Sequence, residues 1–395
     1  MVRTLDGTVF SRVLRAGALA VVREQEALDR MNVFPVRDAD TGANLAATLK
    51  AAASRLGSVA PDGVGAAARA AADGALDGAR GNSGAIFAQF LHGLAGGMDR
   101  HEHVDGAQFA DAAVLGTESA YSALLEPREG TILSVLRAWS EELRSRTADE
   151  DFTEMMHRGL VAARVALANT PRQLEVLARS HVVDAGGQGF VFFLEGIVES
   201  LRGGRETAWT PVEAPAHGLP PFSAEHVEID DSHRFCTEAL LTAREDGTLS
   251  RDAVMTEVRG LGDSLVVAGG ERRLRVHLHT NEPQKFLATL AALGEIERSK
   301  IDDMVLQQLA GREATIAIVT DSTADLPEDV AFRLGVVAVP LTLTLGEESY
   351  LDGVDITPDA FIARVTRGEG VPHSSQPAVN DFVQTYRRLL EYREG

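Results

Sequence analysis

The spacing of apolar residues changes along this chain of 395 residues, and the change limits the folds that it can adopt. From Phe10 to about Leu201, apolar residues recur at helical spacing in segments rich in Ala, Leu, Arg and Glu. The helices expected on this pattern are 9–30, 44–55, 63–76, 83–94, 105–124, 131–146, 152–167 and 187–201, with a short one at 174–179. No run here alternates as a strand does. We therefore expect an all-α bundle of about eight helices, a domain spanning residues 1–203.

A segment rich in Pro and Gly separates this bundle from a region with a different pattern. Residues 204–224 show little periodicity and read as a linker. Residues 225–312 predict an α/β domain. Its expected strands are 234–242, 264–268, 272–280 and 295–301, and its expected helices are 250–259 and 283–293.

A third pattern covers residues 313–395. A buried-type strand at 315–319 opens it, and the expected elements after that strand are a helix at 327–333, a strand at 336–345 and helices at 356–364 and 380–392. This order is that of an open α/β domain. About eighty residues are few for a complete domain of that type, so we expect a partial one.

The charge and the cysteine content exclude several classes of protein. Asp and Glu outnumber Lys and Arg by 58 to 38, a formal charge of −20, which disfavours binding to nucleic acid or to an anionic membrane. No stretch approaches the roughly 20 apolar residues of a transmembrane segment. The single cysteine, Cys236, excludes an intrachain disulfide and fits a reducing compartment. We expect a cytoplasmic protein; the composition leaves a homodimer open.

Two aspartates follow the proline that ends an apolar segment near residue 34. Asp38 and Asp40 are close enough in sequence to favour a cation between them, and magnesium prefers such oxygen ligands. Thr41, Gly42 and Asn44 supply donors where a helix begins, a favourable place for a phosphate. The same residues also suit an Asp-rich helix cap or turn, and the stretch alone leaves both interpretations open.

Polar loops that contain glycine recur at other helix junctions. They are residues 77–84, 129–131 and 184–189. Alternate junctions of an up-and-down bundle lie at the same end, where these loops would present backbone N–H groups to a polyphosphate. None of the loops matches a Walker A motif or a G-x-G-x-x-G motif after a strand, so a nucleotide site here would be of another type.

Three residues of the middle region have the chemistry of a zinc site. His277 and His279 are two apart on an expected strand, so both imidazoles project from one face. Cys236 lies on another expected strand, and Glu238 or water would complete four ligands. Ordinary strand histidines beside a buried cysteine would give the same pattern.

Six motifs of residues 1 to about 310 resemble, in order and rough spacing, those of the ATP-binding subunit of bacterial fatty-acid kinase. The motifs are NVFPVRDADTG (32–42), GARGNSG (78–84), EGTIL (129–133), VDAGGQG (183–189), FCTE (235–238) and HLHTNEP (277–283). The N-terminal domain of that family is similar to the nucleotide-binding subunit of dihydroxyacetone kinase. The chain departs from the family pattern at Arg37, usually proline, and at Ala39, usually glycine.

The C-terminal region instead resembles the start of the DegV fatty-acid-binding family. The matching motifs are VTDSTADLP (319–327), YLDGVDI (350–356) and SSQP (374–377). This resemblance implies that the Ser374 hydroxyl helps to hold a fatty-acid carboxylate. The later parts of that domain are absent from the sequence, so we do not expect a complete acyl pocket.

The kinase resemblance also implies roles for individual residues. Asp38 and Asp40 would hold magnesium on the ATP phosphates, with Asn32 and Asp29 the nearest candidates for a third ligand. The residues implied at the nucleotide are Thr41, Asn44, Gly81, Asn82, Ser83, Thr131, Asp184, Ala185, Gly186 and Gly187. Cys236, His277 and His279 would bind zinc, which we expect to be structural or partner-docking because it lies outside the ATP-binding domain.

The implied reaction transfers the γ-phosphoryl group of ATP to the carboxylate of a fatty acid, giving an acyl phosphate. The fatty acid would arrive on a separate DegV-like carrier protein, because the free acid is insoluble. Such transfer depends mainly on positioning and charge neutralisation, with no strong base required. The alternatives are a kinase for dihydroxyacetone or another small carbonyl compound, and a regulator that senses nucleotide or lipid without catalysis.

Overall fold

The computed structural model describes residues 2–34, 40–58, 63–145, 151–203, 233–245 and 247–304, and parts of 318–391. Gaps in the last part are 327–329, 332–333, 335, 347, 353–355 and 357. The chain divides into two compact units: the first contains the helical region and most of the following sheet, and the second contains residues 302–395. The expected linker and residues 35–39, which include Asp38, lie outside the described residues.

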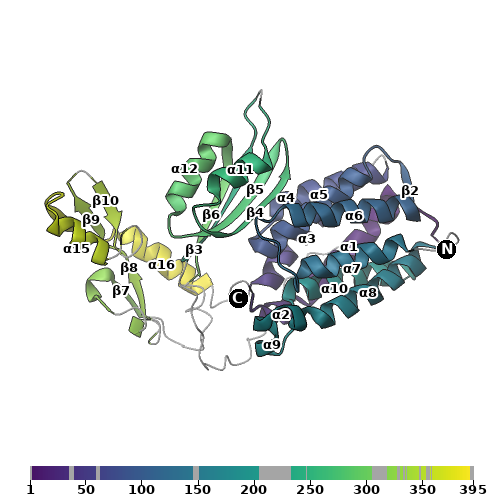
Figure 1. Ribbon diagram of the computed structural model, residues 1–395, viewed down its shortest axis with the longest axis horizontal. Helices are drawn as coiled ribbons and strands as arrows, with labels where there is room; N and C mark the ends of the chain where they lie inside the picture. The colour runs from purple at the N-terminus through teal and green to yellow at the C-terminus, as the bar shows by residue number, and fades with distance from the viewer. Residues whose placement is uncertain are drawn as a thin grey trace. The chain divides into compact units, whose positions relative to one another are not determined.

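The N-terminal region is a bundle of α-helices, as its apolar periodicity predicts (Figure 1). Its helices are α1 (Gly7–Arg23), α2 (Gln25–Met31), α3 (Thr41–Ser58), α4 (Val64–Gly78), α5 (Gly81–Gly97), α6 (Gly106–Ser122), α7 (Ile132–Arg144), α8 (Phe152–Gln173), α9 (Glu175–Ser180) and α10 (Ala185–Leu201). Helix α1 packs on α10, α3 on α4, α5 on α6, and α7 on α8. Phe87, Phe90 and Phe190 are buried between them, and the rings of Phe90 and Phe190 meet edge to face at 5.7 Å.

Two features of the bundle differ from the sequence prediction. The helix expected over 9–30 is divided at Glu24, whose N–H donates to the carbonyl of Val21 and ends α1. Two short strands, β1 (Thr4–Asp6) and β2 (His103–Asp105), pair antiparallel. Three residues are too few to show alternation, so the sequence could not indicate them. Each strand ends in an aspartate that caps the next helix: Asp6 caps α1, and Asp105 caps α6.

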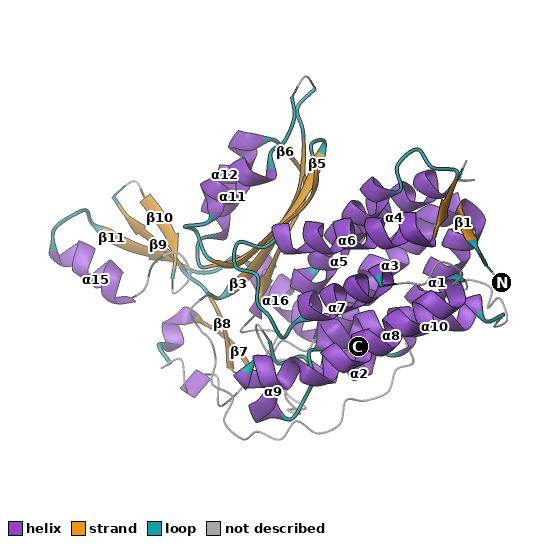
Figure 2. Ribbon diagram, turned by 45° about the vertical axis from the view of Figure 1, so that its right-hand side comes forward, coloured by secondary structure: helices purple, strands orange, loops and turns teal. Residues whose placement is uncertain are grey.

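The sheet that follows has the order β4-β5-β3-β6, and it confirms the α/β prediction for the middle region. Its strands are β3 (Phe235–Thr242), β4 (Asp263–Gly270), β5 (Arg273–Thr280) and β6 (Glu295–Asp303), with helices α11 (Arg251–Val258) and α12 (Pro283–Leu293) on one face (Figure 2). Alternation along β4 gives this sheet two apolar faces. Leu265 and Val267 share a core with α11 and α12, whereas Val266 and Ala268 belong to the core of the helical bundle.

The second unit contains two small sheets. Strands β7 (Ile318–Asp321) and β8 (Val336–Val339) pair in parallel. Strands β9 (Thr342–Leu345), β10 (Glu348–Leu351) and β11 (Pro372–Ser375) form a sheet in the order β10-β9-β11. The described helices are α15 (Pro358–Thr366) and α16 (Val379–Glu391). The strand expected over 336–345 is divided at Pro340, which has no N–H to donate to a ladder. The helix expected at 327–333 lies largely outside the described residues.

No helix among the described residues combines the length and the hydropathy that crossing a membrane requires.

Candidate functional site

Alternation along β3 and β5 gathers polar side chains on the face of the sheet that meets the helical bundle. Ala239 and Leu241 of β3, and the apolar residues of β5, pack toward α11 and α12. The side chains between them project from the opposite face. That face carries Cys236, Glu238, Arg275, His277 and His279. All of them except Cys236 are buried, so the polar groups need partners within the protein.

Backbone and side-chain contacts dock this face on the bundle. The amide of Val267 donates to the carbonyl of Ala123 at 2.8 Å, and the amide of Gly269 donates to Gln89 Oε1 at 2.5 Å. Arg273 of β5 forms an ion pair with Asp77 of α4 at 2.6 Å. These contacts, with Val266 and Ala268 in the bundle core, join the sheet to the helices within one unit.

The docking creates one cavity from residues that the sequence assigned to two sites. It is lined by Asn32, Phe34, Asp40, Thr41, Asn44, Gly81, Asn82, Ser83, Cys236, His277 and His279. Seven of these are candidates for binding magnesium or nucleotide, and three are the candidate zinc ligands. We expected the zinc residues to lie apart from the nucleotide site. The structure differs because β3 and β5 present them directly to the helix starts of the bundle.

The starts of four helices converge at this end of the bundle. A Cβ on Gly81 would lie 2.3 Å from Asn44 Nδ2, so α5 begins against α3. A Cβ on Gly186 would lie 3.4 Å from both Ser83 Oγ and Ile132 Cβ, so α10 begins beside α5 and α7. The first amides of a helix have no partner within the helix and attract anions. This is the arrangement of donors that the recurring polar loops predict.

Two carboxylates lie near the start of α3. Asp29 accepts a hydrogen bond from the amide of Ala43 at 3.0 Å and is also bonded by the amide of Gly42. Burial raises the pKa of Asp29 to about 7; the two amides oppose this rise, and the charge of Asp40 adds to it. Among the described residues that line the cavity, none is Lys or Arg. A polyphosphate at this site would therefore need a cation to offset Asp40.

Asp184 and Thr131 cap helices through hydrogen bonds that the sequence did not reveal. Asp184 is the N-cap of α10, and its Oδ2 accepts the amide of Gly187 at 2.6 Å while the carboxylate also accepts the amide of Ile132. Burial raises its pKa to about 6, and the two amides oppose that rise. The Thr131 hydroxyl caps α7 by accepting the amide of Leu133. The Asp184 carboxylate thus ties the start of α7 to the start of α10, and Ala185, Gly186 and Gly187 form the first turn of α10.

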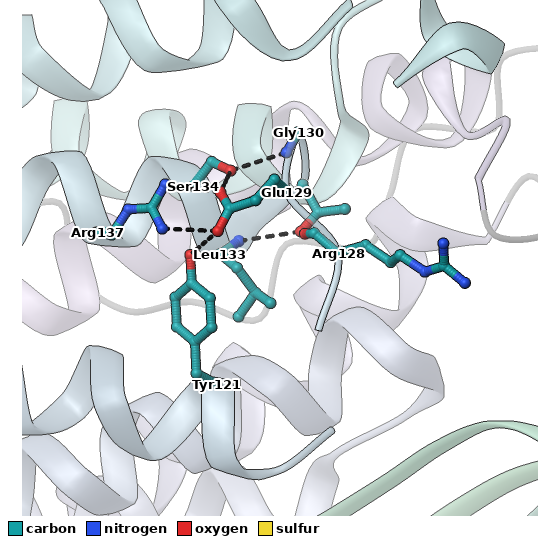
Figure 3. Close-up of polar contacts among 8 residues, drawn as sticks. Tyr121, Arg128, Glu129, Gly130, Leu133, Ser134 and Arg137 are labelled. Carbon is teal, nitrogen blue, oxygen red and sulfur yellow. Dashed lines mark hydrogen bonds and ion pairs between the residues drawn. The ribbon is translucent and has the colours of Figure 1, made fainter. Parts of the chain in front are cut away.

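Glu129 anchors the loop that leads into α7 (Figure 3). Its carboxylate accepts two hydrogen bonds from Arg137, at 2.7 and 2.8 Å, and one each from Ser134 and Tyr121. The Ser134 hydroxyl in turn accepts the amide of Gly130, which has a φ of 82°. Burial raises the pKa of Glu129, but these donors outweigh it and hold the pKa below its usual value. In the sequence Glu129 stands out only as part of the EGTIL motif. The spacing of Ser134 and Arg137, one turn apart on α7, is the signal for their shared partner.

Cys236, His277 and His279 form a compact cluster whose ligand atoms lie within 4.8 Å of one another. Cys236 Sγ is 3.7 Å from His277 Nδ1. Each histidine has a carboxylate beside its Nδ1: Glu238 Oε1 at 3.3 Å from His277, and Asp263 Oδ1 at 3.6 Å from His279. His277 Nε2 is buried without a hydrogen-bond partner among the described residues. One thiol and two imidazoles are ligands suited to zinc, and these three lie close enough together for one ion, so the cluster fits zinc.

Glu238 is not placed as the fourth zinc ligand that we considered. Its Oε2 accepts Arg275 at 2.5 Å, and its Oε1 accepts the amide of Gly81 at 2.5 Å. Although burial opposes ionisation, the contacts with His277, Arg275 and Gly81 lower the pKa of Glu238 to about 2. Its position two residues after Cys236 is the signal that places it on the same face.

Ser374 lies in the second unit, on β11 opposite Leu343 of β9, and it is exposed.

Three domain families match successive parts of the chain. Residues 35–199 match the DAK2 domain, residues 232–310 match the FakA-like middle domain of fatty acid kinase, and residues 315–394 match the DegV family.

Among curated proteins, YloV of Bacillus subtilis is 34% identical over 319 residues, covering 77% of this chain and 56% of its own length. An uncharacterized protein of Staphylococcus saprophyticus is 30% identical over 309 residues, with the same coverage of 77% and 56%. The chain thus spans about half the length of these relatives.

Among solved structures, the dihydroxyacetone kinase of C. freundii in complex with AMP-PNP and Mg²⁺ aligns with 51% of this chain and 35% of its own chain, at 15% identity and a TM-score of 0.40.

Proposed function

We propose that the chain is a fatty-acid kinase, because its successive parts match the DAK2 domain, the FakA-like middle domain of fatty acid kinase and the DegV family in that order. The reaction transfers the γ-phosphoryl group of ATP to the carboxylate of a fatty acid. The acceptor arrives on a separate DegV-like carrier protein. The observation that supports this proposal most strongly is the single cavity that joins the helix starts of the bundle to Cys236, His277 and His279.

The nucleotide occupies the bundle side of the cavity. Thr41, Asn44, Asn82 and Ser83, which line the cavity where α3 and α5 begin, bind the phosphates. Gly81 and the turn of Ala185, Gly186 and Gly187 allow the backbone to approach them. Asp184 and Thr131 act by holding the starts of α7 and α10 in place, rather than by direct contact.

The acidic residues at the start of α3 hold Mg²⁺. Asp40 and Asp38 are the ligands, and Asn32 and Asp29 are the candidates for a third. Asp40 fits this role because it faces a cavity without described Lys or Arg, beside a second carboxylate whose ionisation burial already disfavours. Bound Mg²⁺ supplies the positive charge that the phosphate oxygens need during transfer.

The phosphoryl transfer needs no catalytic base. A carboxylate oxygen of the fatty acid forms a bond to the γ-phosphorus, and the bond from that phosphorus to the bridging oxygen of ADP breaks. The products are acyl phosphate and ADP. The acceptor is already an anion at neutral pH, so no proton has to be removed before attack. The residues of the chain position the reactants and offset their charges.

Cys236, His277 and His279 hold Zn²⁺ on the sheet side of the same cavity. Zinc at this place supplies further positive charge close to the phosphates. Glu238 and Asp263 orient the two histidines from behind.

Steady-state turnover of ATP tests the kinase assignment. The full chain is mixed with MgATP, oleate and a complete fatty-acid-binding protein of the DegV family, and ADP release is measured. We expect release only when both the lipid and the carrier are present. Asp40→Asn and Asp38→Asn abolish it, whereas Asp111→Asn, at an exposed carboxylate of α6, serves as the matched control.

Three results would contradict this assignment. If Asp40→Asn consumes ATP at the wild-type rate, the proposed Mg²⁺ site is wrong. Turnover with dihydroxyacetone in place of oleate and carrier supports the small-carbonyl kinase, and nucleotide binding without any turnover supports a regulator.

A further inference from the structure

Glu238 contacts the bundle side and the sheet side of the cavity at once. Its Oε1 accepts the amide of Gly81 at 2.5 Å and lies 3.3 Å from His277 Nδ1. Its Oε2 accepts Arg275 at 2.5 Å, and the Glu238 side chain is only 4% exposed. A buried carboxylate held by three donors from two domains has little freedom to move.

The contact with Gly81 fixes the start of α5. Gly81 has a φ of 56°, and a Cβ there would lie 2.3 Å from Asn44 Nδ2, so backbone and neighbour both restrict this position to glycine. Its amide is the first of α5, directly before Asn82 and Ser83, which line the cavity. Any displacement of Gly81 would therefore move both of these residues.

The contact with His277 fixes its imidazole. A carboxylate beside Nδ1 favours the tautomer with the proton on Nδ1, which leaves the lone pair on Nε2. That Nε2 is the buried nitrogen without a described partner. One carboxylate oxygen thus sets both the tautomer of His277 and the place of the α5 start.

We propose that Glu238 is a positioning residue for the phosphoryl transfer, which holds the first turn of α5 and the His277 ring at a fixed separation. This inference rests on the proposed kinase function. It gives the residue a role distinct from docking, because the Gln89–Gly269 and Ala123–Val267 hydrogen bonds join the sheet to the bundle without it. It also predicts a loss of rate without a matching loss of nucleotide affinity, since the proposed phosphate ligands all lie on the bundle.

The test separates binding from turnover in the full chain. Calorimetry gives the Kd for Mg²⁺ with AMP-PNP, and ADP release with oleate and the carrier gives kcat. Glu238→Gln keeps one oxygen, which can still accept the Gly81 amide and His277, but an NH₂ group replaces the oxygen that accepts Arg275, so the side chain loses the charge and the contact that hold it in place. We expect its Kd to stay within about threefold and its kcat to fall by about 100-fold, as a misplacement of about 1 Å would cause.

Two further variants separate positioning from folding. Gln89→Ala removes another hydrogen bond between bundle and sheet, away from the cavity, and we expect its kcat to stay within about threefold of wild type. Glu238→Asp keeps the charge on a side chain one methylene shorter, and we expect it to recover part of the kcat lost in Glu238→Gln.

The possible failures are distinguishable. Wild-type protein that binds no nucleotide or releases no ADP contradicts the kinase proposal and the inference that rests on it. An active wild type with a Glu238→Gln variant of near-normal kcat overturns the role of Glu238 alone. Equal loss of kcat in Gln89→Ala and Glu238→Gln, or equal loss of kcat and affinity in Glu238→Gln, reduces Glu238 to a docking contact.

Discussion

Replacing Asp184 with asparagine is expected to change how the stability of the helical bundle depends on pH. Asp184 is 6% exposed at the N-cap of α10, and its carboxylate accepts the amides of Gly187 and Ile132. Burial raises its pKa from 3.8 to about 6 in spite of these two bonds. The folded chain therefore keeps this proton at pH values where the unfolded chain has lost it.

The sign and the size of the effect follow from these two values. As the pH rises from below 3.8 to above 6, ionisation of Asp184 destabilises the folded state, and the loss is complete once both states are ionised. At about 1.4 kcal/mol per pH unit, a separation of about two units corresponds to about 3 kcal/mol. About 2 kcal/mol of this falls between about pH 4.5 and about pH 7.5.

Asp184→Asn removes this titration. Its side chain has one oxygen in place of two, and the NH₂ group that replaces the other oxygen is a donor that cannot accept an amide, so we expect a constant cost of about 1 kcal/mol. The difference in unfolding free energy between wild type and variant should consequently shift in favour of the variant by about 2 kcal/mol between about pH 4.5 and about pH 7.5.

Denaturant titrations at several pH values measure this difference. Buried Trp139 reports the unfolding of the bundle by fluorescence, and both proteins are compared at each pH so that the other titrating groups cancel. Asp105→Asn, at the exposed N-cap of α6, controls for exchanging a cap residue. Curves for wild type and Asp184→Asn that stay parallel across this range would refute the reasoning from burial.

Two other predictions concern the loop before α7 and the metal cluster. Arg137→Gln removes both hydrogen bonds from Arg137 to Glu129, so we expect the Kd for AMP-PNP and Mg²⁺ to rise by about tenfold while the far-ultraviolet circular dichroism stays unchanged. Arg128→Gln, at an exposed ion pair with Glu126, is the control. An equal rise of Kd in both variants would contradict the role of Glu129. Cys236→Ser and His279→Ala should lower the zinc content measured by mass spectrometry after purification, and unchanged zinc in both would exclude the cluster as its site.

The helices and the middle strands could be predicted from the sequence because their signals are local. Apolar periodicity places most helices of the bundle within a few residues of their observed bounds, and alternation does the same for β3, β4 and β5. Very short or interrupted elements lacked such a signal. Strands β1 and β2 have three residues each, and the division between β8 and β9 depends on the single Pro340.

The joint cavity could not be predicted, because it depends on how the sheet docks on the bundle. Val266 and Ala268 give β4 an apolar outer face, yet nothing local says that α5 covers it. That docking places His277 in the same cavity as Asn82 and Ser83, which are far from His277 in the sequence. The partners of Glu238 and Asp184 also depend on tertiary contacts, so the sequence indicated these residues without revealing their hydrogen bonds.

The central claim is that nucleotide and the Cys236 cluster share one cavity, and the alkylation of Cys236 tests it most directly. Cys236 is the only cysteine of the chain, so iodoacetamide reports on this thiol alone, measured in zinc-depleted protein with Mg²⁺ present. We expect saturating AMP-PNP to slow alkylation by about tenfold in the wild type and to have no effect in Asp40→Asn. Nucleotide that binds the wild type by calorimetry without slowing the alkylation of Cys236 would contradict the claim.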